Sequence, residues 1–168
     1  MMAATAPTVV LGVGNELYRD DGVGVVVARE LAATELPQGV TVVEGRVGGL
    51  DLLFDMEGAS RVIIVDAVDM SQPPGTVLVF QPNEVNTINL ETVASVHQIG
   101  LGHVLELGQL LGLTEHIHIV GIQPEEVAAG FALTQTVAGA VPEALQAVRR
   151  LLCATEPQAA EGPAEGSV

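Results

Sequence analysis

The sequence predicts an α/β protein built on a largely parallel β-sheet with helices on both faces. Five runs rich in Val and Ile are continuous rather than alternating, at residues 8–13, 40–44, 61–66, 76–81 and 116–122. Continuous apolar strands are typical of parallel sheets that are buried on both faces. Most of these runs are separated by segments with helical periodicity, as a parallel sheet with helical crossovers requires.

The predicted helices lie at residues 23–36, 49–57, 100–111 and 136–153. Pro37 and Gly39 end the first, and Pro142 predicts a kink in the last. The link over residues 66–76, DAVDMSQPPGT, has turn residues and no helical period. It is too short for a parallel crossover, so we expect the strand at about 76–81 to run antiparallel, at an edge of the sheet.

Length and composition predict one domain at residues 1–153 and a disordered acidic tail at 154–168. No apolar run reaches the roughly 20 residues of a membrane span, and the N-terminus lacks a basic region, so we expect a cytoplasmic protein. The net charge of −15 and the lack of lysine argue against nucleic-acid partners. The single Cys153 excludes an internal disulfide, and its place in the last helix predicts a buried thiol.

A glycine-rich turn and an acid pair follow the first strand, in the sequence VVLGVGNELYRDDGVG at residues 9–24. Leu17 stands where a dinucleotide fingerprint would have its third glycine, which argues against nucleotide binding. We interpret the glycines as permitting a tight turn and a close backbone approach. We expect Asp20 to cap the following helix and Asp21 to lie at the mouth of the sheet. Glu16 is expected to be a solvated loop residue.

Asp66 closes the buried run RVIIVD, where an unpaired carboxylate would be costly. Right-handed crossovers place the first and third strands side by side, so Asp21 and Asp66 should face each other where the strand order reverses. His97 precedes a predicted helix and would complete a His/Asp/Asp set suited to zinc, nickel, iron or manganese. His116 and His118 have no acid at matching spacing to complete a site, and His103 is six residues after His97, which suits joint ligation on neither a helix nor a strand.

Four segments resemble the hydrogenase maturation proteases, which trim the C-terminus of nickel–iron hydrogenase large subunits. They are GVGNELYRDDGVGV at 12–25, VIIVDAVDMSQPPGTV at 62–77, VHQIGL at 96–101 and VGIQPEEV at 120–127. The resemblance covers about residues 8–153. It implies a three-layer α/β/α sandwich with a five-stranded, mostly parallel sheet and one antiparallel strand.

The resemblance also implies an activity. Asp21, Asp66 and His97 would be the catalytic and metal-contacting residues, and the hydrogenase large-subunit precursor would be the partner. Cleavage would follow nickel insertion, with the nickel supplied by the precursor and serving as the recognition element. A monomer is the expected state.

The sequence is also compatible with three alternatives. A metal-dependent hydrolase of small molecules would use the same three residues with a permanently bound metal. A hydrogenase assembly chaperone would bind the precursor without cutting it. A phosphorylation-dependent receiver domain would also need acids after its first and third strands, but it uses a lysine that this chain lacks.

Overall fold

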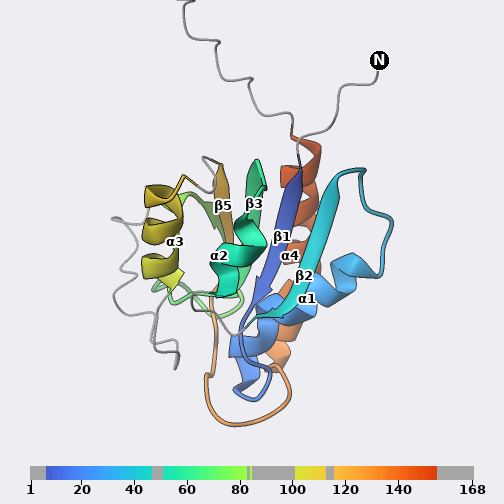
Figure 1. Cartoon of the computed structure of the whole chain (residues 1–168). Helices are drawn as coiled ribbons and strands as arrows, with labels where there is room; N and C mark the ends of the chain where they lie inside the picture. The colour runs from blue at the N-terminus through green and yellow to red at the C-terminus, as the bar shows by residue number, and fades with distance from the viewer. Residues whose placement is uncertain (1–6, 47–50, 83, 85–100, 113–115, 155–168) are drawn as a thin grey trace, which may run out of the picture.

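One mixed sheet organises the molecule in the computed structural model, which describes residues 7–46, 51–82, 84, 101–112 and 116–154 (Figure 1). The strand order is β2-β1-β3-β5-β4. The strands are β1 (Thr8–Val13), β2 (Val40–Arg46), β3 (Arg61–Ala67), β4 (Val77–Phe80) and β5 (Ile117–Ile122). Among these described strands, β4 alone pairs antiparallel, with β5, at the end of the strand order. The prediction of an antiparallel edge strand is therefore confirmed.

Helices cover both faces of this sheet, as predicted (Figure 1). Helices α1 (Val23–Ala32) and α4 (Gln135–Cys153) pack on one face. Helices α2 (Asp51–Met56) and α3 (Leu101–Leu110) lie on the other. A short 3-10 helix, η1 (Arg19–Gly22), precedes α1 and was not expected from the sequence. The sheet and the helices on its two faces therefore form the three-layer α/β/α sandwich that was predicted.

The core has two halves, one on each side of the sheet, because side chains alternate along a strand. In β3, Ile63 and Val65 face the half that contains α1 and α4. Val62 and Ile64 face the half that contains α2 and Leu105 of α3. All four of these strand residues are fully buried. The continuous apolar run of the third strand is thus explained by burial on both faces.

Three details differ from the sequence-based expectations or refine them. Helix α1 ends at Ala32, four residues before the predicted end. Just after it, the Thr34 hydroxyl donates to the carbonyl oxygen of Leu31 at 2.7 Å. This side-chain bond competes with continuation of the helix. Helix α4 runs unbroken for 19 residues with Pro142 inside it. Cys153 is exposed at the end of α4, so the prediction of a buried thiol is wrong.

None of the helices in the described part of the chain combines the length and apolar character that a membrane span requires.

Candidate active site

The candidate site lies at the carboxyl ends of β1 and β3, which are parallel neighbours with Gly12 opposite Val65. From β1 the chain passes to β2 on one side, and from β3 it continues to β4 and then β5, which both lie on the other side. This reversal of strand order is where open α/β sheets form a crevice for ligands. The loop after β1 carries Asp21, and Asp66 lies within the last two residues of β3.

Two glycines let the chain approach these strand ends closely. Gly14 has φ of 137°, and a β-carbon there would overlap the carbonyl oxygen of Asp21. A β-carbon on Gly24, in the first turn of α1, would overlap the carbonyl oxygens of Val13 and Val65. The start of α1 therefore rests on the backbone next to Asp66. This confirms that the glycines serve a tight turn and a close backbone approach.

Asp21 and Asp66 interact electrostatically, as the sequence analysis expected. Asp66 is buried, and this burial raises the pKa of its carboxyl group well above the ordinary value. The negative charge of Asp21 raises this pKa further, whereas a hydrogen bond from the Ala67 backbone lowers it. Asp21 is half-buried, and its Oδ2 accepts a hydrogen bond from the Asn15 backbone N–H at 2.9 Å. The site thus holds two carboxylates that disfavour each other's charge.

This pair suits a metal ion, because a cation would relieve the repulsion and carboxylate oxygens are metal ligands. Among the residues that the structure describes, no cluster of three or more His, Cys, Asp or Glu side chains could hold a metal ion by itself. His97 lies outside the described residues, so its role stays a prediction. His118 contacts Gln81, with 3.3 Å between the two Nε2 atoms.

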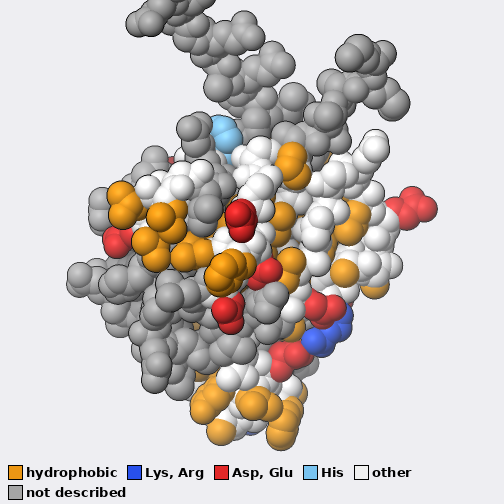
Figure 2. Space-filling model, in the orientation of Figure 1, with side chains coloured by type: hydrophobic (Ala, Val, Ile, Leu, Met, Phe, Trp, Pro, Cys, Tyr) orange, Lys and Arg blue, Asp and Glu red, His pale blue; other side chains and the backbone are white. Residues whose placement is uncertain are grey.

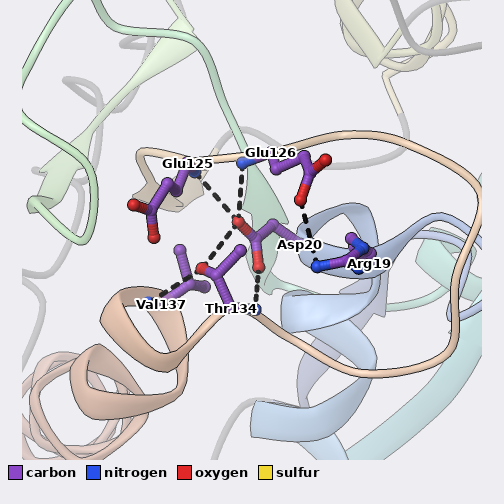
Figure 3. Close-up of polar contacts among 6 residues, drawn as sticks. All are labelled: Arg19, Asp20, Glu125, Glu126, Thr134 and Val137. Carbon is purple, nitrogen blue, oxygen red and sulfur yellow. Dashed lines mark hydrogen bonds and ion pairs between the residues drawn. The ribbon is translucent and has the colours of Figure 1, made fainter.

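Asp20 has a different function from the helix cap that we expected, and that prediction is wrong. Its carboxylate is fully buried and accepts four hydrogen bonds (Figure 3). Oδ2 accepts from the backbone N–H groups of Glu125 and Glu126 and from the Thr134 hydroxyl, each at 2.9 Å. Oδ1 accepts from the Thr134 backbone N–H at 2.7 Å. Neither η1 nor α1 has a side-chain cap.

These bonds join the β1 loop (residues 14–22) to the β5 loop (residues 123–134). The backbones of the two loops also pair directly. The Arg19 N–H donates to the Gly130 carbonyl, and the Gly130 N–H donates to the Leu17 carbonyl, both at 2.9 Å. An ion pair between Arg19 and Glu126, at 3.0 Å, adds to them (Figure 3). The segment that carries Asp21 is therefore fixed by the far end of the chain.

Gln123 fixes the segment that follows Asp66, a role that was not predicted from the sequence. Its buried side-chain oxygen accepts from the backbone N–H groups of Met70 at 2.7 Å and Gln72 at 3.3 Å. Its amide nitrogen donates to Asp69 Oδ1 at 3.2 Å. The only available signal was a glutamine directly after a buried strand, where an amide can satisfy turn backbone groups.

Glu16 is ion-paired, so the expectation of a merely solvated loop residue was incomplete. Both of its carboxylate oxygens accept from Arg29, at 2.9 and 2.8 Å. Arg29 Nε also donates to Glu44 at 2.9 Å. The hydrogen bond from Arg29 lowers the pKa of Glu16. This network attaches the β1 loop to α1 and β2 at the surface.

The fold and the site together define a class of α/β protein. Its two carboxylates can contact a metal, and they lie at the switch point, where the strand order of the sheet reverses. A family model described as HycI, hydrogenase maturation protease, matches residues 25–151. The chain belongs to the hydrogenase maturation protease family. Members of this family are peptide hydrolases, so the chain is an enzyme of that class and acts in hydrogenase maturation.

Individual relatives agree with this assignment. The hydrogenase 2 maturation protease of Escherichia coli is 34% identical over 142 residues, covering 83% of this chain and 86% of that protein. The hydrogenase expression/formation protein HupD of Rhizobium leguminosarum is 34% identical over 85% of this chain and 72% of its own length. The solved structure of the hydrogenase maturating endopeptidase HybD from E. coli superposes with a TM-score of 0.76 at 31% identity, covering 87% of this chain and 91% of that one.

Proposed function

We propose that this enzyme removes the C-terminal extension of a nickel–iron hydrogenase large-subunit precursor after nickel insertion, and that it recognises the nickel that the precursor carries. The observation that supports this most directly is the pair formed by Asp21 and Asp66 at the switch point. Burial and mutual repulsion both act against two charged carboxylates there, so the pair favours a substrate that brings a cation.

In this proposal the nickel is part of the substrate rather than a resident cofactor. Asp21 and Asp66, together with His97, would contact it. Imidazole and carboxylate groups both suit nickel. Three ligands leave positions for the precursor's own groups, so the metal need not leave the precursor in order to be recognised.

Hydrolysis also requires a base close to the bond that is cut. One of the two carboxylates would take a proton from water as the water oxygen attacks the amide carbon. The same proton would then pass to the amide nitrogen as the carbon–nitrogen bond breaks. The hydrogen bond from Asn15 would keep Asp21 oriented during these steps. Both carboxylates come from rigid segments, which favours accurate positioning.

The test is to mix the purified protein with the precursor, loaded with nickel or free of it, and to follow the precursor by mass spectrometry. We expect loss of a C-terminal peptide only in the nickel-loaded sample. Asp21→Ala and His97→Ala should abolish trimming while the far-UV circular dichroism stays native. Glu125→Gln is the matched control, because its side chain is exposed at the same edge of the sheet.

Several outcomes would contradict the proposal. Trimming of the nickel-free precursor would show that nickel is not the recognition element. Normal trimming by Asp21→Ala or His97→Ala would show that the assigned residues are not the active site. Binding without any mass change would identify an assembly chaperone. Stoichiometric zinc or nickel in the purified protein without precursor would favour a metal-dependent hydrolase of small molecules. Light scattering tests the accompanying proposal of a monomer, and cell fractionation tests that of a cytoplasmic location.

A further inference from the structure

The β5 loop contains a run of seven residues without a polar side chain, Val127 to Leu133, with the sequence VAAGFAL. Surface loops are usually polar, yet none of these seven residues is buried. Phe131 is 86% exposed and Val127 is 45% exposed. Leu17 in the β1 loop is 55% exposed. We call Leu17, Val127 and Phe131 the Phe131 patch.

Backbone pairing brings the members of this patch together. The Leu17 carbonyl accepts from Gly130, the residue next to Phe131, and Tyr18 forms a parallel bridge with Gly130. Figure 2 shows hydrophobic side chains gathered at the lower end of the molecule, where Figure 1 places the loop between β5 and α4. An exposed apolar group of this kind is typical of an interaction surface.

The patch is held firmly although it is exposed. The Asp20 carboxylate binds the β5 loop at Glu125, Glu126 and Thr134, on both sides of the apolar run. Leu133 packs against the core, whereas Val127 and Phe131 stay exposed on the anchored loop. A surface that is already ordered loses little entropy when a partner binds, which favours affinity.

The position of the patch indicates its occupant. The β1 and β5 loops both leave the carboxyl ends of parallel strands, which is the edge that holds Asp21 and Asp66. Any polypeptide cut at these carboxylates must lie across this edge. The one cation in the pairing of the two loops, Arg19, is already bound to Glu126. The contact offered to the substrate at the patch itself is therefore apolar rather than ionic.

We infer that the Phe131 patch is a docking surface for an apolar segment of the hydrogenase large-subunit precursor, beside the bond that is cut. This inference rests on the proposed function and adds a second contact to it, separate from the nickel. The patch supplies binding, and the carboxylates supply the chemistry. Loss of an apolar anchor should therefore raise KM and leave kcat unchanged, because the lost contact is equally strong in the ground state and the transition state.

The experiment compares Phe131→Ser with Phe54→Ser in the full-length protein. Phe54 lies on α2 and is 74% exposed, so it matches Phe131 in type and exposure, but it lies outside the paired β1 and β5 loops. Trimming of the nickel-loaded precursor gives kcat and KM, and biolayer interferometry gives the affinity. We expect Phe131→Ser to raise KM and Kd about tenfold or more, as for an interface hot spot, with kcat unchanged. Phe54→Ser should match the wild type.

The effect should persist in 0.5 M NaCl, since an apolar contact is not screened by salt. Leu17→Ser should act in the same direction. Unchanged KM in Phe131→Ser, or an equal effect of Phe54→Ser, would overturn the docking inference while trimming by the wild type upholds the proposed function. A wild-type protein that neither binds nor trims the precursor would contradict both the docking inference and the proposed function. A patch that instead joins two copies of this chain would appear as a dimer that Phe131→Ser dissociates, which also contradicts the inference.

Discussion

The Asp20 carboxylate is bound by groups that lie 105 to 114 residues further along the chain. Its neighbour Asp21 faces Asp66 instead and belongs to the candidate site. Two adjacent aspartates thus have separate functions because successive side chains leave the 3-10 turn in different directions. One holds the β5 loop, and the other is available for chemistry.

Asp20→Ala should lower the free energy of unfolding by about 3 kcal/mol or more, because three backbone donors and a hydroxyl lose a charged acceptor. Urea unfolding measures the loss. Hydrogen exchange should also accelerate at the amides of Glu125, Glu126 and Thr134. Glu125→Ala is the control and should stay within about 0.5 kcal/mol of the wild type. Equal stability of Asp20→Ala and the wild type would show that solvent replaces these bonds at no cost.

Asp66→Asn should abolish trimming and yet stabilise the metal-free protein at neutral pH, by about 1 kcal/mol, which is a common gain when an active-site group is replaced. The pKa of Asp66 is higher in the folded than in the unfolded protein, because burial and Asp21 disfavour its charge. The folded state therefore binds the proton more tightly. The contribution of Asp66 to the free energy of unfolding of the wild type therefore falls as the pH rises from about 4 through the pKa of Asp66 in the folded protein.

The Asn variant lacks this dependence. The difference between the two proteins should accordingly be small near pH 4 and largest above the folded pKa of Asp66. Urea unfolding between pH 4 and pH 8 in the presence of a chelator measures it. A variant that is less stable than the wild type at pH 8 would contradict the prediction.

At the scale of elements, the contact between α1 and the ends of β1 and β3 depends on a missing side chain. Gly24→Ala would place a methyl group against the carbonyl oxygens of Val13 and Val65. Because backbone cannot yield as a flexible side chain can, α1 must shift. We expect a loss of about 3 kcal/mol or more, at the upper end of overpacking effects.

Gly139→Ala is the matched control for this prediction. Gly139 lies in α4 with nothing within 4 Å of an added β-carbon. Alanine there should raise stability by about 0.5–1 kcal/mol, since glycine is unfavourable within a helix. Thermal unfolding followed by circular dichroism compares the two variants. If both alanines stabilise, the close packing of α1 on the strand ends is looser than the geometry indicates.

The elements could be predicted because their signals are local. Runs of Val and Ile mark β1 and β3, and the short link after Asp66 requires the antiparallel β4. The proximity of Asp21 to Asp66 follows from crossover handedness alone. The partners of Asp20 and Gln123 could not be predicted, because they depend on how loops distant in sequence pack together. The position of His97 stays a prediction.

At the scale of the whole molecule, 21 acidic residues face only six arginines. This imbalance makes the folded chain repel itself, and salt screens such repulsion. We expect Tm to rise by a few degrees, on the order of 1 kcal/mol, between 10 and 200 mM NaCl. Differential scanning calorimetry measures this rise. It should shrink in a variant with three exposed acids neutralised, namely Glu30→Gln, Glu35→Gln and Glu143→Gln.

A Tm that falls with salt would instead show that ion pairs such as Arg29 with Glu16 and Glu44 outweigh the general repulsion.

The anchoring of the β5 loop by Asp20 also bears on how this enzyme can be re-engineered. Asp20 binds Glu125 and Glu126 before the apolar run and Thr134 after it. Leu133, at the end of the run, also packs against the core. Among the backbone hydrogen bonds between described residues, those of this run are made by Gly130. The segment is therefore held at both of its ends and, through the Gly130 backbone, near its middle. If the docking inference holds, exchanging the exposed Val127 and Phe131 for the residues of another family member should change client affinity while the carboxylates stay in place.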